Sequence, residues 1–276
     1  AARLAELAPL LEVPGVDHGP WPISLLGRGG RDQQEYFANV RADLADMNAF
    51  ARRFGPRVAL EVYETKLPAS AFQPVAHNQI PPLAATTGFL LNRDWPAPLA
   101  LFLEAPAMKE TCVPPLLEAL HEDGQAAAAG QPSRSPRPGL KIRCGGLEAA
   151  AFPSAELLAK ILCGAARART PLKATAGLHH PFRHADAGIN VVMHVFVNLR
   201  GAACAGWLEG APGGAVKKIR GDETAANFSL SESSLAWKSR TWSADQVGKM
   251  RREFFTSLGS CSFDEPRQDL RAAGWL

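Results

Sequence analysis

The sequence predicts an α/β fold built as a (β/α)8 barrel, incomplete at its N-terminus and irregular around its sixth and seventh strands. Three observations favour it. Segments typical of buried strands alternate with amphipathic helical patterns, which favours parallel pairing. Within each strand, apolar side chains alternate with polar ones, so the two faces differ. Together the polar faces would line the mouth of a barrel, where binding sites usually lie.

Six segments have the composition of buried strands. A further strand before Ala1 and a weak one at 227–231 would complete the barrel, so we expect the full-length chain to begin upstream of Ala1. The connection from Gly177 to Asn190 is too short for a crossover helix, which makes that unit irregular or a hairpin. The predicted strands are 21–27, 57–67, 99–105, 140–145, 172–177 and 190–199.

Helical patterns lie between several strands, with apolar residues recurring every three or four positions. Serine followed three residues later by glutamine or glutamate marks two helix starts near the C-terminus. The predicted helices occupy 31–54 and begin at Pro153-Ser154, at Ser243 with Gln246 and at Ser262 with Glu265, the last ending near Gly274.

We expect one barrel-like domain over 1–276. Two stretches interrupt it with the composition of flexible insertions, at about 122–139 and 206–222. The first combines alanine with scattered proline, glycine, serine and arginine. The second is rich in glycine and carries three cationic residues.

Composition narrows the class of protein. Of the 276 residues 46% are hydrophobic, and 30 lysines and arginines against 27 acidic residues give a net charge of +3 without a dense basic block. This argues against nucleic-acid binding, and we find no apolar stretch suited to crossing a membrane. The five cysteines lack any C-x-x-C spacing, which favours a reducing intracellular compartment, the cytoplasm or a plastid stroma.

The polar residues of the strands form the candidate site. In 140–146 and 172–177 cationic side chains oppose apolar ones, and buried cations require anionic partners. We therefore predict a charged pocket that binds a small anionic substrate. The inward residues assigned by strand parity are Glu61, Glu104, Lys141, Arg143, Lys173, Thr175, His194 and Asn198.

Lysine chemistry fits this set best. A lysine that is partly desolvated and close to other cations can act as an uncharged amine and attack a carbonyl to form a Schiff base. We assign that role to Lys173, with Lys141 as its cationic neighbour. Glu104 or Glu61 would shuttle protons at the adjacent carbon, with His194 also in the catalytic set.

Substrate-binding groups follow the strands. Gly145 and Gly146 could offer backbone N–H groups to a phosphate, with Arg143 as a bidentate partner. Thr175, Asn198, His179 and His180 complete the predicted substrate-binding residues.

The histidines offer a second chemistry. His179, His184 and His194, with a carboxylate such as Glu104, could hold a divalent metal with an open position and so serve a hydrolase or lyase. We favour no cofactor, but this alternative stays open. A third hypothesis, from a different class, is a non-catalytic barrel that serves as a subunit of a larger assembly.

Two strands resemble a known enzyme family. The segments KATAG (173–177) and LKIRCGG (140–146) are similar to the two lysine-bearing strands of deoxyribose-phosphate aldolases and related class I aldolases. The resemblance implies Lys173 as the Schiff-base lysine and Lys141 as its assistant. In this chain the two strands come in the opposite order, and Arg143 stands where that family has a small residue.

A broader resemblance rests on KIRCGG (141–146), KATAGLHH (173–180) and GSCSFDEP (259–266), which are similar to motifs of a family of bacterial barrel-like proteins without an established activity. It implies extra sequence before Ala1. In that family a glycine commonly follows the histidine matching His194, where this chain has Val195. The alanine-rich insertions would suit a plastid-targeted homologue. From the lysine chemistry, together with the aldolase-like strands, we expect a lyase acting on a phosphorylated or carboxylated carbonyl compound.

Overall fold

The computed structural model describes residues 20–75, 79–96, 99–128, 138–186, 188, 190–262 and 264–276. The chain divides into two compact units, and one domain over 1–276 stays a prediction. The first takes in 1–106 and 122–139, and the second takes in 107–121 and 140–276. Each is described by itself.

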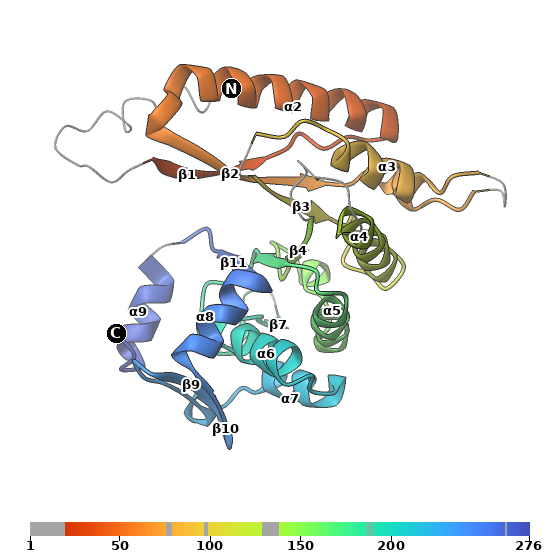
Figure 1. Cartoon of the computed structure of the whole chain (residues 1–276). Coiled ribbons are helices and arrows are strands. Elements are labelled where there is room, and N and C mark those ends of the chain that lie inside the picture. Colours follow the sequence, from red (N-terminus) through yellow and green to blue (C-terminus); the bar gives the residue numbers. More distant parts are fainter. Residues whose placement is uncertain are drawn as a thin grey trace. The chain divides into compact units, whose positions relative to one another are not determined.

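The first unit is a parallel sheet with helices. Its elements are β1 (Trp21–Leu26), α2 (Gln33–Phe54), β2 (Val58–Lys66), α3 (Pro82–Leu91) and β3 (Ala100–Glu104), with 3-10 turns at Gly55–Arg57 and Ala69–Phe72. The strands pair in the order β1-β2-β3. Helix α2 runs along β1 and β2 (Figure 1). It begins where the Asp32 carboxylate accepts from the Glu35 N–H at 2.8 Å, and its buried stripe consists of Tyr36, Val40, Met47, Phe50 and Phe54.

The second unit has its own parallel strands, β4 (Gly139–Arg143), β5 (Leu172–Thr175) and β11 (Phe255–Gly259). They pair in the order β4-β5-β11. The sequence did not reveal β11, which follows a helix directly. Its position beside β5 brings the end of the chain next to the segment that follows β5.

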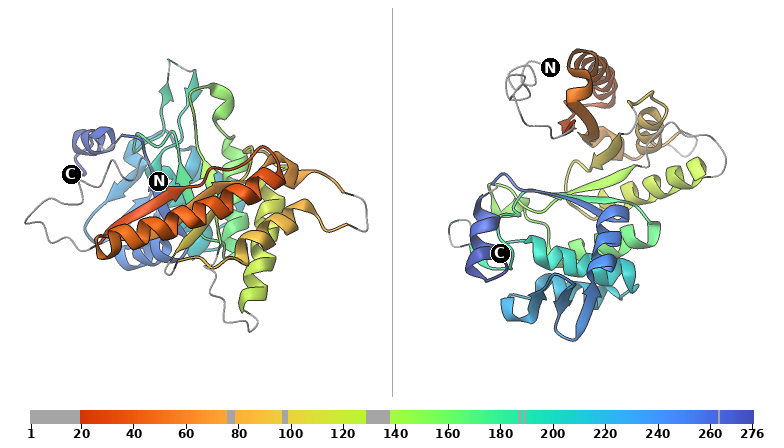
Figure 2. Two further views of the ribbon diagram at one scale, coloured as in Figure 1. Left: turned by 90° about the horizontal axis from the view of Figure 1, so that it is seen from above. Right: turned by 60° about the vertical axis from the view of Figure 1, so that its left-hand side comes forward.

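Helices account for most of the second unit. Three of them, α5, α6 and α7, pack against one another (Figure 1 and the right-hand view of Figure 2). Small buried residues line α6, and a Cβ on Gly201 would lie 3.2 Å from Ile219 Cγ2, so α6 and α7 approach closely. The helices are α4 (Val113–Ala128, of which 113–121 belong to this unit), α5 (Ala155–Ala168), α6 (Phe196–Leu208), α7 (Gly213–Gly221), α8 (Ala244–Glu253) and α9 (Asp264–Ala272). A 3-10 turn at Ala149–Ala151 precedes α5, and another lies at Ala225–Asn227.

Two small antiparallel sheets complete the unit. One is the hairpin of β6 (Ala185–Asp186) and β7 (Val191–Val192). The other has the order β10-β9-β8, from β8 (Phe228–Leu230), β9 (Ser234–Trp237) and β10 (Arg240–Ser243). The weak eighth barrel strand that we predicted at 227–231 is therefore β8, which pairs antiparallel with β9 and belongs to no barrel.

The mixed α/β organisation with parallel strands is confirmed, whereas the described residues do not close an eight-stranded barrel. The strand predicted at 190–199 is wrong: only Val191–Val192 are extended, and α6 begins at Phe196. A short apolar run fits a buried helix as well as a buried strand, and here the small residues that follow allow a central helix.

The two predicted insertions also contain helix. Helix α4 continues through Ala128, and 129–137 lie outside the described residues. The stretch 206–222 holds the end of α6 and all of α7. Buried Val216, Ile219 and Arg220 recur at helical spacing in α7, and the glycines around them concealed that pattern.

One helical stretch of the described chain, Ala149–Ala168, is long and apolar enough to cross a membrane by length and composition alone. We had found no such stretch in the sequence. Leu158, Ile161 and Leu162 of this stretch are buried inside the second unit, which is typical of a core helix, so no strong membrane span is indicated.

Candidate functional site

The centre of the second unit's sheet carries two lysines side by side. Lys141 on β4 and Lys173 on β5 are direct Cα partners in the parallel ladder, so both side chains leave the sheet on one face. Each is only 7% exposed. The opposite face of β4 carries Leu140, Ile142 and Cys144, all fully buried. The ladder thus places two buried lysines next to each other on neighbouring strands.

The neighbouring pair on these strands differs. Arg143 is the Cα partner of Thr175, but it is exposed and not part of a buried cationic cluster as we predicted. Thr175 is half-buried, and its hydroxyl is buried without a hydrogen-bond partner in the described structure.

The carboxylates of the first unit follow a different parity from the prediction. The β1–β2 register shifts between Ile23 and Ser24, because Leu60 pairs with Ile23 and Val62 with Ser24, leaving Glu61 as a bulge. Glu61 is exposed, and Glu64 is the buried carboxylate of β2, accepting from the Ser24 hydroxyl at 2.5 Å.

Glu104 ends β3 and is 4% exposed. In the ladder of the first unit it is the Cα partner of Lys66, and the preceding Phe102 is the partner of Glu64. Glu64, Phe102 and Glu104 therefore share one face of that sheet.

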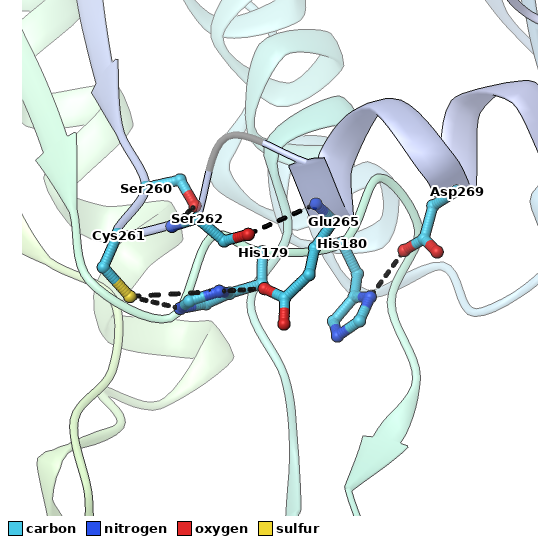
Figure 3. Close-up of polar contacts among 7 residues, drawn as sticks. All are labelled: His179, His180, Ser260, Cys261, Ser262, Glu265 and Asp269. Carbon is cyan, nitrogen blue, oxygen red and sulfur yellow. Dashed lines mark hydrogen bonds and ion pairs between the residues drawn. The ribbon is translucent and has the colours of Figure 1, made fainter.

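Just beyond the carboxyl ends of β5 and β11, His179 lies between Cys261 and Glu265 (Figure 3). Cys261 Sγ lies 3.2 Å from His179 Nε2 and 4.0 Å from Nδ1. His179 Nδ1 lies 2.7 Å from a Glu265 carboxylate oxygen. With a proton on Nδ1, the ring donates to the carboxylate and presents Nε2 as an acceptor for the thiol. The hydrogen bond from His179 is the main reason why the pKa of Glu265 is lowered.

The local backbone explains how these residues meet. Strand β5 is followed by Ala176 and Gly177 at φ angles of 65° and 66°, a left-handed turn that alanine adopts at a cost of about 1 kcal/mol. Gly177 packs against Gly145, since a Cβ on Gly177 would lie 3.1 Å from Gly145 Cα. On the other side, the Ser262 hydroxyl accepts from the Glu265 N–H at 3.2 Å, which fixes the start of α9.

A second histidine–carboxylate pair lies beside the first. His180 Nδ1 is 2.5 Å from an Asp269 carboxylate oxygen, one turn further along α9 (Figure 3). The rings of His180 and His184 pack edge to face, with centroids 4.4 Å apart. His184 Nδ1 lies 3.1 Å from the Phe182 carbonyl. These contacts attach the segment after β5 to α9.

His194 has a different environment, in the loop before α6 and not on a barrel strand as we predicted. Its Nε2–H donates to the Pro153 carbonyl at 2.6 Å, and Nδ1 accepts from Arg220 Nη1 and, at 3.3 Å, from Arg183. Burial first, and Arg220 second, lower the pKa of His194 to about 3. His194 is thus a neutral, fully engaged imidazole that acts as a structural acceptor.

The arginine that holds His194 is itself buried. Arg220 is 1% exposed, and its Nε and Nη2 have no hydrogen-bond partner in the described structure. Burial and the nearby Arg183 lower the pKa of Arg220 to about 9. Arg183 is partly balanced by Glu223, whose carboxylate lies 3.6 Å from Arg183 Nε.

Asn198 also differs from the prediction. It lies on α6, and its amide donates to the carbonyls of Ile219 at 3.0 Å and Asp222 at 2.7 Å. These carbonyls end α7, where helix carbonyls lack partners. Asn198 therefore caps α7 and does not line a pocket between strands.

Side chains pack against the two glycines of the predicted phosphate site, whose backbone N–H groups stay a predicted phosphate contact. A Cβ on Gly145 would lie 2.7 Å from the ring of Phe152, and one on Gly146 would lie 2.7 Å from Ala151 Cβ. Both glycines are required because the chain that follows β4 folds back against them.

Two of the surface hollows on the described part of the chain lie away from the predicted site residues. One, of about 200 Å³, lies in the first unit beside Arg28, Asp43 and Tyr63. The other, of about 350 Å³, lies between α4 and α5 beside Leu117, Ile161 and other residues. Neither is lined by the predicted site residues.

The structure does not bring His179, His184 and His194 together as one metal-ligand set, since both ring nitrogens of His194 are engaged elsewhere. Among the residues that the structure describes, no group of three histidine, cysteine or acidic side chains has the arrangement of a metal site.

Sequence reasoning missed Cys261, Glu265, Asp269 and Arg220. We interpreted Glu265 only as the partner of Ser262 in a helix cap. The Ser262 hydroxyl does accept from the Glu265 N–H, but the Glu265 carboxylate contacts His179, and the Ser262 N–H donates to the Ser260 hydroxyl. The available signal was a cysteine followed four residues later by a glutamate at the start of an acidic helix. This signal could not be interpreted without knowing that β11 pairs with β5, which brings His179 close to these residues.

Comparison of the chain with family models, with curated proteins and with solved structures found no match. The function is therefore inferred from these residues alone.

Proposed function

We propose that this chain is a small-molecule enzyme of the lyase or aldolase type, which acts on a phosphorylated or carboxylated carbonyl compound through Lys173. The observation that carries the proposal is the pairing of Lys141 and Lys173 as buried partners on neighbouring parallel strands. Burial and a like-charged neighbour are the conditions under which lysine amines act as nucleophiles. The resemblance of the two strands to class I aldolases supports the same assignment.

The proposed reaction begins with attack of the Lys173 amine on the substrate carbonyl carbon. The carbinolamine that forms loses water and becomes a Schiff base, which withdraws electrons from the adjacent carbon–carbon bond. Neighbouring strands lie about 5 Å apart and Lys141 is the ladder partner of Lys173, so in this scheme Lys141 exchanges protons with the carbinolamine. This scheme uses residues of the second unit alone.

Reductive trapping tests the proposal. Glycolaldehyde phosphate and pyruvate, one phosphorylated aldehyde and one 2-oxo acid, are each incubated with the protein and borohydride, and adducts are located by peptide mass spectrometry. We expect one adduct on Lys173, lost in Lys173→Met. Lys160→Met is the matched control, because Lys160 is an exposed lysine paired with Glu110 at 2.6 Å.

Unchanged trapping in Lys173→Met, or adducts spread over surface lysines including Lys160, would exclude the Schiff-base role. Lys141→Met tests whether Lys141 assists the reaction at Lys173 or only supports the fold. If it assists, the variant should stay folded and form the adduct on Lys173 more slowly.

The two other hypotheses receive less support. A metal-dependent hydrolase using His179, His184 and His194 requires His194 as a ligand, and the arginines and Pro153 already engage it. A role as a non-catalytic subunit in the cytoplasm or a plastid stays a prediction, which co-purification in a large complex would support.

A further inference from the structure

We propose that Cys261 is a nucleophilic thiol with His179 as its base and Glu265 as the group that orients the base. This makes a second covalent site in the chain, independent of Lys173, and its substrate class is an acyl ester or thioester. The thiol–imidazole–carboxylate order is the arrangement by which thiol nucleophiles are activated.

The separations meet the distance requirements of that arrangement. The thiol is 3.2 Å from Nε2 and 4.0 Å from Nδ1, so it lies beside the ring nearer to Nε2, and Nδ1 is 2.7 Å from a carboxylate oxygen. The separations of 3.2 Å and 2.7 Å are within reach of a hydrogen bond involving sulfur or oxygen. A rotation of the thiol or of the ring aligns sulfur with Nε2 for proton transfer. The carboxylate also fixes the ring tautomer, because only Nδ1–H can donate to it and Nε2 is then free to take the thiol proton.

Access distinguishes this cysteine from the others in the chain. Cys261 is exposed, and His179 is partly open to solvent. Cys144, Cys163 and Cys204 are buried, and burial raises the pKa of each thiol, to about 12 for Cys144 and Cys204. The fifth, Cys112, is half-buried and lies 3.8 Å from the Thr111 hydroxyl. Of these five thiols, Cys261 alone combines exposure with a contact to an imidazole.

His179, Cys261 and Glu265 are positioned by three elements, β5, β11 and α9. His179 belongs to the turn after β5, and Cys261 follows β11 by two residues. The Ser260 hydroxyl accepts from the Ser262 N–H at 3.2 Å, and the Ser262 hydroxyl accepts from the Glu265 N–H. These bonds order the loop that carries the thiol and set the carboxylate on the first turn of α9.

The chemical step is a nucleophilic acyl transfer. The thiol proton moves to His179 Nε2, and sulfur forms a bond to the acyl carbon while the carbonyl π electrons move to oxygen. Collapse of that oxyanion breaks the bond to the alcohol or thiol leaving group, which takes the proton from the imidazolium. Water, activated by the same histidine, then hydrolyses the S-acyl cysteine and returns the free thiol.

Alkylation under native conditions is the first test. Iodoacetamide is added at pH 7 and the rate of modification at each cysteine is followed by peptide mass spectrometry. We expect Cys261 to react at least about tenfold faster than Cys112, and His179→Gln to remove most of that difference. Glu265→Gln should slow Cys261 by an intermediate factor, because the base remains but is no longer oriented. Lys160→Met, which alters an exposed lysine paired with Glu110, should leave the Cys261 rate unchanged.

Equal rates at Cys261 and Cys112, or a Cys261 rate unaffected by His179→Gln, would overturn the proposal. Far-UV circular dichroism establishes that the variants are folded. If His179→Gln does not fold, Glu265→Gln decides, since Glu265 lies on the surface and its loss should alter the orientation of His179 only.

p-Nitrophenyl acetate tests the acyl step. We expect one equivalent of p-nitrophenolate to be released rapidly and an acetyl group to appear on Cys261, with neither in Cys261→Ser. Acetyl found only on surface lysines would overturn the acyl-donor class even if alkylation were fast.

Discussion

His179 and His194 show how differently one chain uses the same side chain. His179 stands at the surface between a carboxylate and a thiol, so its ring is oriented and its second nitrogen faces a reactive group. His194 is buried between two arginines and a carbonyl, which leaves both of its nitrogens occupied. The neighbours of a histidine, and not its place in a motif, decide whether it serves chemistry or structure.

Acid should reveal this difference most strongly. Because the pKa of His194 is about 3 in the folded protein and about 6.5 in the unfolded chain, the unfolded state binds more protons below pH 6.5. Above pH 6.5 the imidazole is neutral in both states, so His194 takes nothing from the stability of the folded protein. As the pH falls from 6.5 towards 3, protonation of His194 in the unfolded chain lowers that stability. We expect its contribution to lower the free energy of unfolding by about 1.4 kcal/mol per pH unit in this window.

Urea unfolding of the native protein and of His194→Gln between pH 7.5 and 4 measures this effect. Glutamine can donate to Pro153 and accept from Arg220 but cannot titrate, so the variant should show a shallower slope. Equal slopes would mean that His194 is not held neutral between the arginines.

Asn198 provides the next test, because it was assigned to the same predicted strand as His194. Asn198→Leu removes the amide that serves the carbonyls of Ile219 and Asp222. We expect a loss of about 2 to 3 kcal/mol in the free energy of unfolding, since the part-buried Asp222 carbonyl would lose the amide donor and the buried Ile219 carbonyl would keep only the Asp222 N–H. Asn92→Leu is a matched control, because the Asn92 amide bonds only a carbonyl of its own exposed helix end. An equal, small loss in both variants would contradict the capping role of Asn198.

The sequence allowed the parallel strands β1 to β5 to be predicted well, because their alternation of apolar and polar residues is local. The error at Glu61 has a physical cause that the alternation does not show: a single bulge in β2 exchanges the faces, so that Glu64 becomes the buried carboxylate. The error at 190–199 arose because an apolar run does not distinguish a buried helix from a buried strand.

The contact between Cys261 and His179 could not be predicted from the sequence, for a different reason. The two residues are separated by 82 positions, and only the pairing of β11 with β5 brings them together. Strand order in a parallel sheet is a long-range property. Motifs could mark both segments as unusual, but not as neighbours.

Gly145 should show a smaller effect. In Gly145→Ala the new methyl group would meet Phe152 at 2.7 Å and Gly177 at 3.1 Å. We expect a loss of about 1 to 2 kcal/mol, because Phe152 must shift and the turn that carries His179 must move with Gly177. Gly214→Ala is the control, since nothing lies within 4 Å of its Cβ position. Thermal or urea unfolding that ranks the two variants equally would contradict this packing role.

The smallest expected effect concerns the two histidine–carboxylate pairs of Figure 3, and it sharpens the comparison within one surface. Asp269 contacts His180 and not His179, although it lies on the same helix as Glu265. Asp269→Asn should therefore change the iodoacetamide rate at Cys261 by less than about twofold, whereas Glu265→Gln should lower it several-fold, because the effect on the thiol is transmitted through the histidine that touches it. Both substitutions remove one negative charge from α9, so a general electrostatic influence of the helix would slow or speed the two variants equally. Equal rates would mean that the net charge of α9, and not the orientation of His179, governs the reactivity of Cys261.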